Sequence, residues 1–135
     1  MKNKVHYHKI EITGVIPMNI SLFTGKTVFD CLKDIEKRFE LDNEMSEGEK
    51  QKRSLGLHFT VTDDDGYKYF ILVLSKESSI GTVSHEILHS AWDFLYHYDI
   101  QVDYYNQEIL ARTIDLITIN VLKYLPCKIK IKHKK

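Results

Sequence analysis

The expected fold is organised by the stretch Gly81-Thr82-Val83-Ser84-His85-Glu86-Ile87-Leu88-His89, which lies in the second half of a 135-residue chain. Apolar side chains recur at helical spacing through and beyond it, at Val83, Ile87, Ala91, Phe94, Leu95 and Tyr98. On a helical wheel, His85, His89, Trp92 and Tyr96 fall on the opposite side. We therefore expect an amphipathic helix that packs through one face and presents two histidines on the other.

The spacing His-Glu-x-x-His has a direct chemical meaning in a helix. Residues four apart lie one above the other, so His85 and His89 can direct imidazole nitrogens at one ion. Glu86 lies about 100° round from His85, where it reaches a water on that ion more easily than the ion itself. The pattern predicts a Zn²⁺ site with His85 and His89 as ligands and Glu86 as general base. Two core histidines satisfied by backbone carbonyls are the alternative interpretation.

A catalytic zinc normally takes three protein ligands, so a third is expected elsewhere. We select Glu108, which opens a second long apolar segment ending near Leu125. Two antiparallel helices joined by the polar residues 99–103 would bring the start of the second helix back toward the histidines. An intrahelical ion pair between Glu108 and Arg112 is the alternative role for this carboxylate. Rival third ligands are Asp93, His97, Asp99 and Asp103.

These residues carry a resemblance to a known class. His-Glu-x-x-His followed at this interval by a helical Glu resembles the gluzincin arrangement of thermolysin-like peptidases. Residues 81–91 together with Glu108-x-x-Ala111 look more like the small predicted zinc metallopeptidases of tailed bacteriophages and related mobile elements. The resemblance covers residues 80–125 and implies a zincin with His85, His89 and Glu108 as ligands and Glu86 as base. The chain departs from the pattern after Ala111, where Arg112 and Asp115 stand in place of a Gly often found there.

Hydrolysis at zinc also needs a donor that holds the developing negative charge. We favour Tyr104 or Tyr105, because they precede Glu108 in the same turn region. The other candidates are Tyr96, His97, Arg112 and the N-terminal group His6, Tyr7 and His8. Each of these residues has a packing role as its simpler interpretation.

Composition bounds the class of protein. A chain of this length with 43% apolar residues is the usual size of one domain, so residues 1–135 are expected to form a single domain. Lys and Arg balance Asp and Glu at 19 each, which gives no argument for nucleic acid or an anionic membrane as a partner. Alternating Lys and Ile in residues 128–135 predict a charged edge strand or a frayed tail.

Two further features concern the compartment. Cys31 and Cys127 stand in unrelated contexts, which is typical of free or buried thiols in a reducing compartment. No signal peptide or membrane-length apolar run is apparent. We expect a cytoplasmic protein, in the host cytoplasm if the chain is phage-encoded.

The rest of the chain predicts a small sheet. Residues 5–16 alternate as a first strand, and an amphipathic helix follows Thr27, with Val28, Leu32, Ile35 and Phe39 on one face. Residues 42–52 are expected to form a loop or a polar helix. Residues 55–62 and 67–75 flank Asp63-Asp64-Asp65-Gly66 as a hairpin, and the second of these strands should lie beside the His-bearing helix.

The expected fold is thus a small α+β zincin-like domain: a short twisted sheet, an N-terminal helix, the His-Glu-x-x-His helix and a C-terminal partner helix. The expected function is zinc-dependent hydrolysis of peptide bonds in a peptide or protein substrate, by a metal-activated water with Glu86 as base. The alternative is a phage-encoded binding protein directed at a host factor, with a structural or degenerate zinc site. The sequence leaves the substrate and the oligomeric state open.

Overall fold

The computed structural model describes residues 4–14, 16–41 and 55–125. Within them the strands are β1 (His6–Ile12), β2 (Met18–Gly25), β3 (Gly56–Thr62) and β4 (Lys68–Ser75). The helices are α1 (Val28–Arg38), α3 (Ile80–His97) and α4 (Gln107–Leu122). The expected loop or polar helix at 42–52 and the C-terminal run at 128–135 lie outside the described residues.

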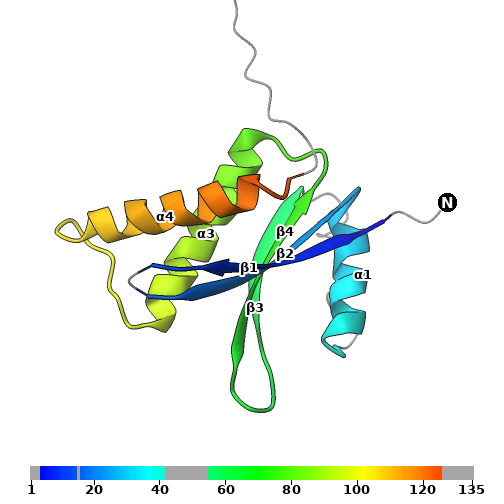
Figure 1. The fold of residues 1–135 in the computed structure, drawn as a ribbon, viewed down its shortest axis with the longest axis horizontal. Coiled ribbons are helices and arrows are strands. Elements are labelled where there is room, and N and C mark those ends of the chain that lie inside the picture. The colour runs from blue at the N-terminus through cyan, green and yellow to red at the C-terminus, as the bar shows by residue number, and fades with distance from the viewer. Residues whose placement is uncertain (1–3, 15, 42–54, 126–135) are drawn as a thin grey trace, which may run out of the picture.

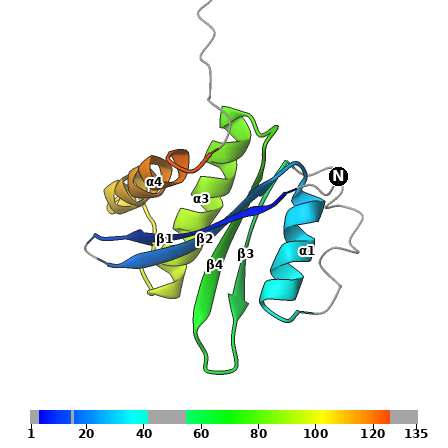
Figure 2. The ribbon, with the colours of Figure 1, turned by 45° about the vertical axis from the view of Figure 1, so that its right-hand side comes forward.

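The strands form one mixed sheet in the order β1-β2-β4-β3. β1 pairs with β2 and β3 pairs with β4 in antiparallel fashion, whereas β2 and β4 are parallel. Helix α1 covers one face of this sheet, and α3 and α4 cover the other (Figures 1 and 2). The chain therefore forms a small α+β domain, as expected from the sequence, with an apolar layer on each side of the sheet.

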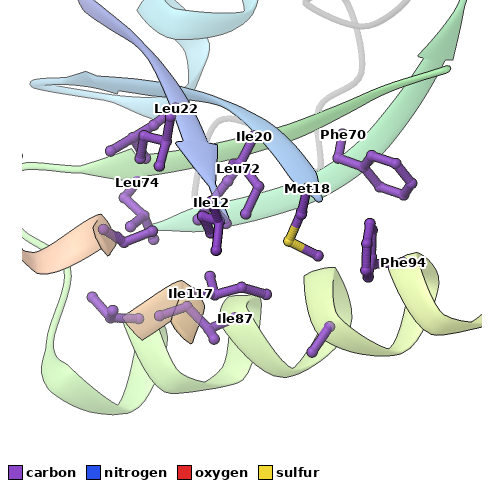
Figure 3. Packing of buried hydrophobic residues seen from close by; sticks show 14 of the residues in the cluster. Ile12, Met18, Ile20, Leu22, Phe70, Leu72, Leu74, Ile87, Phe94 and Ile117 are labelled. Atoms are coloured by element: carbon purple, nitrogen blue, oxygen red, sulfur yellow. The ribbon is translucent and has the colours of Figure 1, made fainter. Parts of the chain in front are cut away.

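Alternation along the strands assigns each side chain to one layer. Phe70, Leu72 and Leu74 of β4 face α3, whereas Ile71 and Val73 face α1. Figure 3 shows the larger layer, in which Ile87 and Phe94 of α3 meet the sheet and Ile117 of α4 closes the cluster.

Strand β2 was not expected. Met18 to Leu22 alternate apolar and polar side chains, as a strand does, and every residue of β2 except Asn19 is buried. The signal for this strand was therefore in the sequence, but our interpretation of residues 5–16 as one strand stopped before it. The expected single N-terminal strand is therefore a hairpin, and its second arm lies at the centre of the sheet beside β4.

Several local signals were confirmed. The Oγ1 of Thr27 accepts a hydrogen bond from the Asp30 amide and caps α1. The 63–66 turn closes the β3–β4 hairpin, with Gly66 at a φ of 85° that disfavours any side chain. The expected apolar stripe of α3 is buried except for Tyr98. No helix in the described part of the chain is both long enough and apolar enough to cross a membrane.

Candidate metal centre

The candidate centre lies on α3, whose first turn is capped by Ser79: its Oγ accepts a hydrogen bond from the Thr82 amide. His85 and His89 project from the exposed side of this helix, and their Nε2 atoms lie 3.2 Å apart. Two nitrogens bound tetrahedrally at about 2.0–2.1 Å from one zinc ion would be separated by about 3.4 Å. The two rings are within hydrogen-bond distance of each other, and their spacing is also close to what a single tetrahedral ion requires.

Glu86 completes the group. The candidate ligand atoms of His85, Glu86 and His89 all lie within 4.8 Å of one another, and they are the one such group found in the described residues. The two imidazoles are exposed, whereas Glu86 is only 7% exposed. Its Oε2 is buried and has no hydrogen-bond partner among the described residues. Leaving a buried carboxylate oxygen unpaired is costly, which fits an atom whose partner arrives with the bound group.

The edge strand β3 forms the wall beside Glu86. A hollow of about 450 Å³ opens there, and it is lined by Leu55, Gly56, Gly81, Thr82, His85 and Glu86. A Cβ on Gly56 would lie 2.8 Å from the Cγ of Glu86, so this close approach requires glycine. Gly56 was missed by our sequence analysis, although an isolated glycine opening a β-rich run is a signal for such contacts.

The backbone of β3 is free along its outer edge in the described structure. The Leu55 carbonyl accepts from the Ser75 amide, and the Asp63 amide donates to the Tyr67 carbonyl. Antiparallel pairing alternates, so the odd-numbered residues between them bond to β4 and the even-numbered ones point outward. The amide and carbonyl groups of Gly56, His58 and Thr60 therefore face away from β4, next to the helix that carries the histidines.

Glu108, the expected third ligand, lies outside the group. It stands in the first turn of α4, 77% exposed, and accepts a hydrogen bond from Arg112 Nε at 3.4 Å. This ion pair, between residues four apart in a helix, is the alternative to zinc ligation by Glu108 that we named from the sequence. The start of α4 lies beside the end of α3, where Ile109 and Arg112 share a cleft with Phe94 and Leu95. Its role as a zinc ligand stays a prediction.

The expected oxyanion donors are also separate from the group. Tyr104 and Tyr105 lie ahead of α4, 80% and 92% exposed, and their rings contact each other at 5.6 Å between centroids. Neither lines the hollow beside Glu86. Tyr96 is exposed on α3, and the His97 ring packs against Phe70 and Tyr98. The role of Tyr104 or Tyr105 in holding negative charge stays a prediction.

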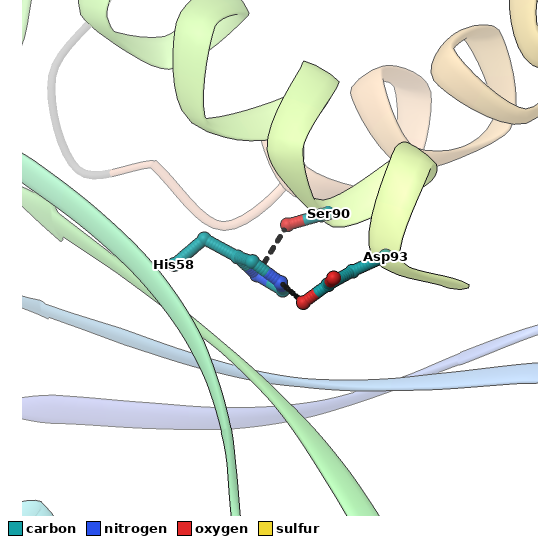
Figure 4. A network of polar contacts seen from close by, with 3 residues as sticks. All are labelled: His58, Ser90 and Asp93. Atoms are coloured by element: carbon teal, nitrogen blue, oxygen red, sulfur yellow. Dashed lines mark hydrogen bonds and ion pairs between the residues drawn. The ribbon is translucent and has the colours of Figure 1, made fainter. Parts of the chain in front are cut away.

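Asp93, a rival ligand, has another partner. Its Oδ2 lies 2.9 Å from Nε2 of His58, and Nδ1 of the same ring lies 2.9 Å from Ser90 Oγ (Figure 4). With 1.5 Å of rise per residue, Asp93 stands about 12 Å along the helix from His85, too far to share its ion. Asp99 and Asp103 lie in the α3–α4 connection, and Asp103 Oδ1 accepts from the Tyr105 and Asn106 amides.

Ser90, His58 and Asp93 are the residue types of a serine hydrolase triad, and they contact one another in that order. The Ser90 hydroxyl, however, is not available as a nucleophile. Ser90 is 1% exposed in the α3–sheet interface. Burial lowers the pKa of His58, more than the hydrogen bond to Asp93 raises it. A neutral ring with its proton on Nε2 satisfies both contacts, since Nε2–H donates to Asp93 and Nδ1 accepts from Ser90.

A second hollow, of about 460 Å³, lies between the β1–β2 turn, the end of α3 and α4. Its lining is mostly apolar and includes none of His85, Glu86 and His89. The two hollows have similar volumes, and the chemistry of the chain points to the more polar one, at β3. Comparisons with models of known protein families, with curated proteins and with solved structures found no match.

Proposed function

We propose that this chain is a zinc-dependent peptide hydrolase with a zincin-like fold, in which His85 and His89 hold the ion and Glu86 is the general base. The observation that carries the proposal is the imidazole pair at 3.2 Å beside a buried carboxylate with an unpartnered oxygen. A purely structural histidine pair would not need that carboxylate held next to it without a partner.

In the proposed reaction, the exposed histidines hold the ion and the buried Glu86 carries the proton. Zinc, when bound, supplies a Lewis acid and lowers the pKa of a coordinated water to about 7. The Glu86 carboxylate is positioned to accept a proton from water and to return it to the leaving amine. Its burial against Gly56 fixes the side chain and limits its solvation by bulk water.

The edge of β3 supports peptide as the substrate class. An extended chain can add to a free sheet edge through main-chain hydrogen bonds, whatever its side chains are. The resemblance to zincins implies the same arrangement, in which a sheet edge beside the active-site helix holds the substrate across the metal. The outward groups of Gly56 and His58 would supply these bonds next to Glu86.

The testing experiment compares wild type with Glu86→Gln on a peptide library, with cleavage read by mass spectrometry and zinc content by elemental analysis. We expect Glu86→Gln to keep zinc and to lose turnover by a factor of about 100 or more. The exposed Glu77→Gln, in the turn before α3, is the matched control and should behave as wild type. Equal cleavage by wild type and Glu86→Gln would refute the hydrolase proposal.

One observation favours a second candidate, a zinc-dependent binding protein without catalysis. Only two imidazoles and one carboxylate come together in the described residues, and Glu108 is paired with Arg112. A site of this kind could act as a structural clasp for recognition of a host factor. In that case Glu86→Gln would leave biological activity unchanged, while His85→Ala and His89→Ala would abolish it.

A further inference from the structure

The network of His58, Ser90 and Asp93 joins β3 to α3 by two directional contacts as well as by packing. His58 comes from the edge strand β3, and its side chain is 4% exposed. Both ring nitrogens have partners on α3, one buried hydroxyl and one carboxylate (Figure 4). An apolar side chain of similar size would fill the same space without two directional bonds.

The position of the network relative to the candidate metal centre is specific. Strand β3 touches α3 first at Gly56, against Glu86, and two residues later at His58, against Ser90 and Asp93. Two strand residues advance about 6.6 Å, which is close to the rise of one helical turn from Glu86 to Ser90. The strand and the helix therefore run in the same direction, and the two contacts lie on either side of His89 along the helix.

We propose that His58 is a positioning residue: through Ser90 and Asp93 it holds β3 in register with α3, so that the outward backbone groups of Gly56 and His58 meet an extended peptide at a fixed distance from Glu86. This role rests on the proposed hydrolase function. An edge strand paired on one side only has half of the lateral support of a central strand. Within the described residues β3 pairs with β4 alone, and the buried imidazole gives the strand a second attachment, to α3.

The first measurement needs neither substrate nor metal. Native-state amide hydrogen exchange is compared between wild type, His58→Phe and Asp93→Asn in the metal-free protein. The amides of Leu57 and Phe59, which bond to β4, should exchange about tenfold faster in both variants, because a charge-assisted bond holding the strand is lost or weakened. Amides of β2 should keep their rates. The control is His6→Phe, the same substitution on the opposite edge strand, and it should leave the amide exchange rates of β3 unchanged.

The second measurement connects the strand to the site. Acetohydroxamic acid binds through a metal alone, whereas a hydroxamate carrying three alanine residues can also pair with β3. The zinc-loaded His58→Phe protein should bind the small probe as wild type does and the peptidyl probe at least about fivefold more weakly. Zinc affinity, measured by competition with a chelating dye, should change less than about twofold, since His58 is not a ligand.

The other possible results would overturn either the positioning role of His58 or the proposed hydrolase function. Unchanged exchange of β3, or faster exchange across all four strands, overturns the positioning role. Equal weakening of both hydroxamates also overturns it, because His58 would then support the metal site and not the strand. If wild type binds neither hydroxamate when loaded with zinc, the proposed function fails, while the exchange data still decide whether His58 holds β3.

Discussion

Gly56 and Glu86 are in contact across the interface between β3 and α3, with no room for a side chain on the strand: an added Cβ would lie 2.8 Å from Glu86 Cγ and 3.0 Å from Thr82 Cγ2. The buried carboxylate is therefore held against the backbone of an edge strand. This contact connects the group that performs the proposed chemistry to the surface that would hold the substrate.

Substitution Gly56→Ala should displace the Glu86 side chain. We expect a loss of about 1–3 kcal/mol in the free energy of unfolding and a fall in peptide cleavage, with zinc still bound. Chemical denaturation and elemental analysis measure these effects. Gly14→Ala, in the β1–β2 turn, is the matched control, because its Cβ would come no nearer than 3.4 Å to Leu116 Cδ1, an ordinary van der Waals contact, and Gly14 does not line the hollow beside Glu86. Equal losses in both variants would contradict the contact between Gly56 and Glu86.

Substitution Glu108→Ala separates the two roles of that carboxylate. The ion pair with Arg112 is exposed and joins residues four apart, so its loss should cost no more than about 0.5 kcal/mol in the metal-free protein. Zinc content of the same variant, beside that of His89→Ala, then tests the ligand prediction. Zinc lost from Glu108→Ala would identify Glu108 as a third ligand, whereas zinc retained would leave only the ion pair.

Stability should fall in mild acid because of His58. Its pKa lies below the usual value of 6.5 in the folded protein, chiefly through burial, so the unfolded chain binds a proton that the folded chain does not. The contribution is fully present above about pH 6.5 and is lost as the pH falls below it, with a slope of at most about 1.4 kcal/mol per pH unit. Urea unfolding of metal-free wild type between pH 5 and pH 8 measures the slope. The His58→Phe protein should show a flatter profile over the same range, and an identical profile would contradict the assignment.

Cys31 should be inert in the folded protein. It is fully buried beneath the sheet in α1, and burial with nearby Asp30 and Asp34 raises its pKa to about 12. Reaction with iodoacetamide at pH 8, followed at the peptide containing Cys31, should proceed only as fast as the domain opens. Denaturation in urea should restore rapid labelling. Fast labelling of the native protein would show that α1 opens locally.

The sequence predicted those features that depend on neighbours along the chain. The burial of one face of α3, the exposure of His85 and His89, the cap at Thr27 and the 63–66 hairpin turn follow from periodicity and from local hydrogen bonds. The motif on α3 was equally readable, because a helix fixes the relative direction of residues one and four apart. The candidate zinc ligands on that helix therefore follow from the sequence alone.

The tertiary structure decided what depends on residues distant in sequence. In the sheet, β2 is a central strand and β3 is an edge strand. Packing of β3 on α3 brings Gly56 against Glu86 and His58 against Asp93. Glu108 pairs with Arg112 on its own helix. Helical periodicity gives the face on which a side chain lies but not the element that covers that face. The order of strands and the crossing of helices are set by how the apolar faces pack together, which no local pattern encodes.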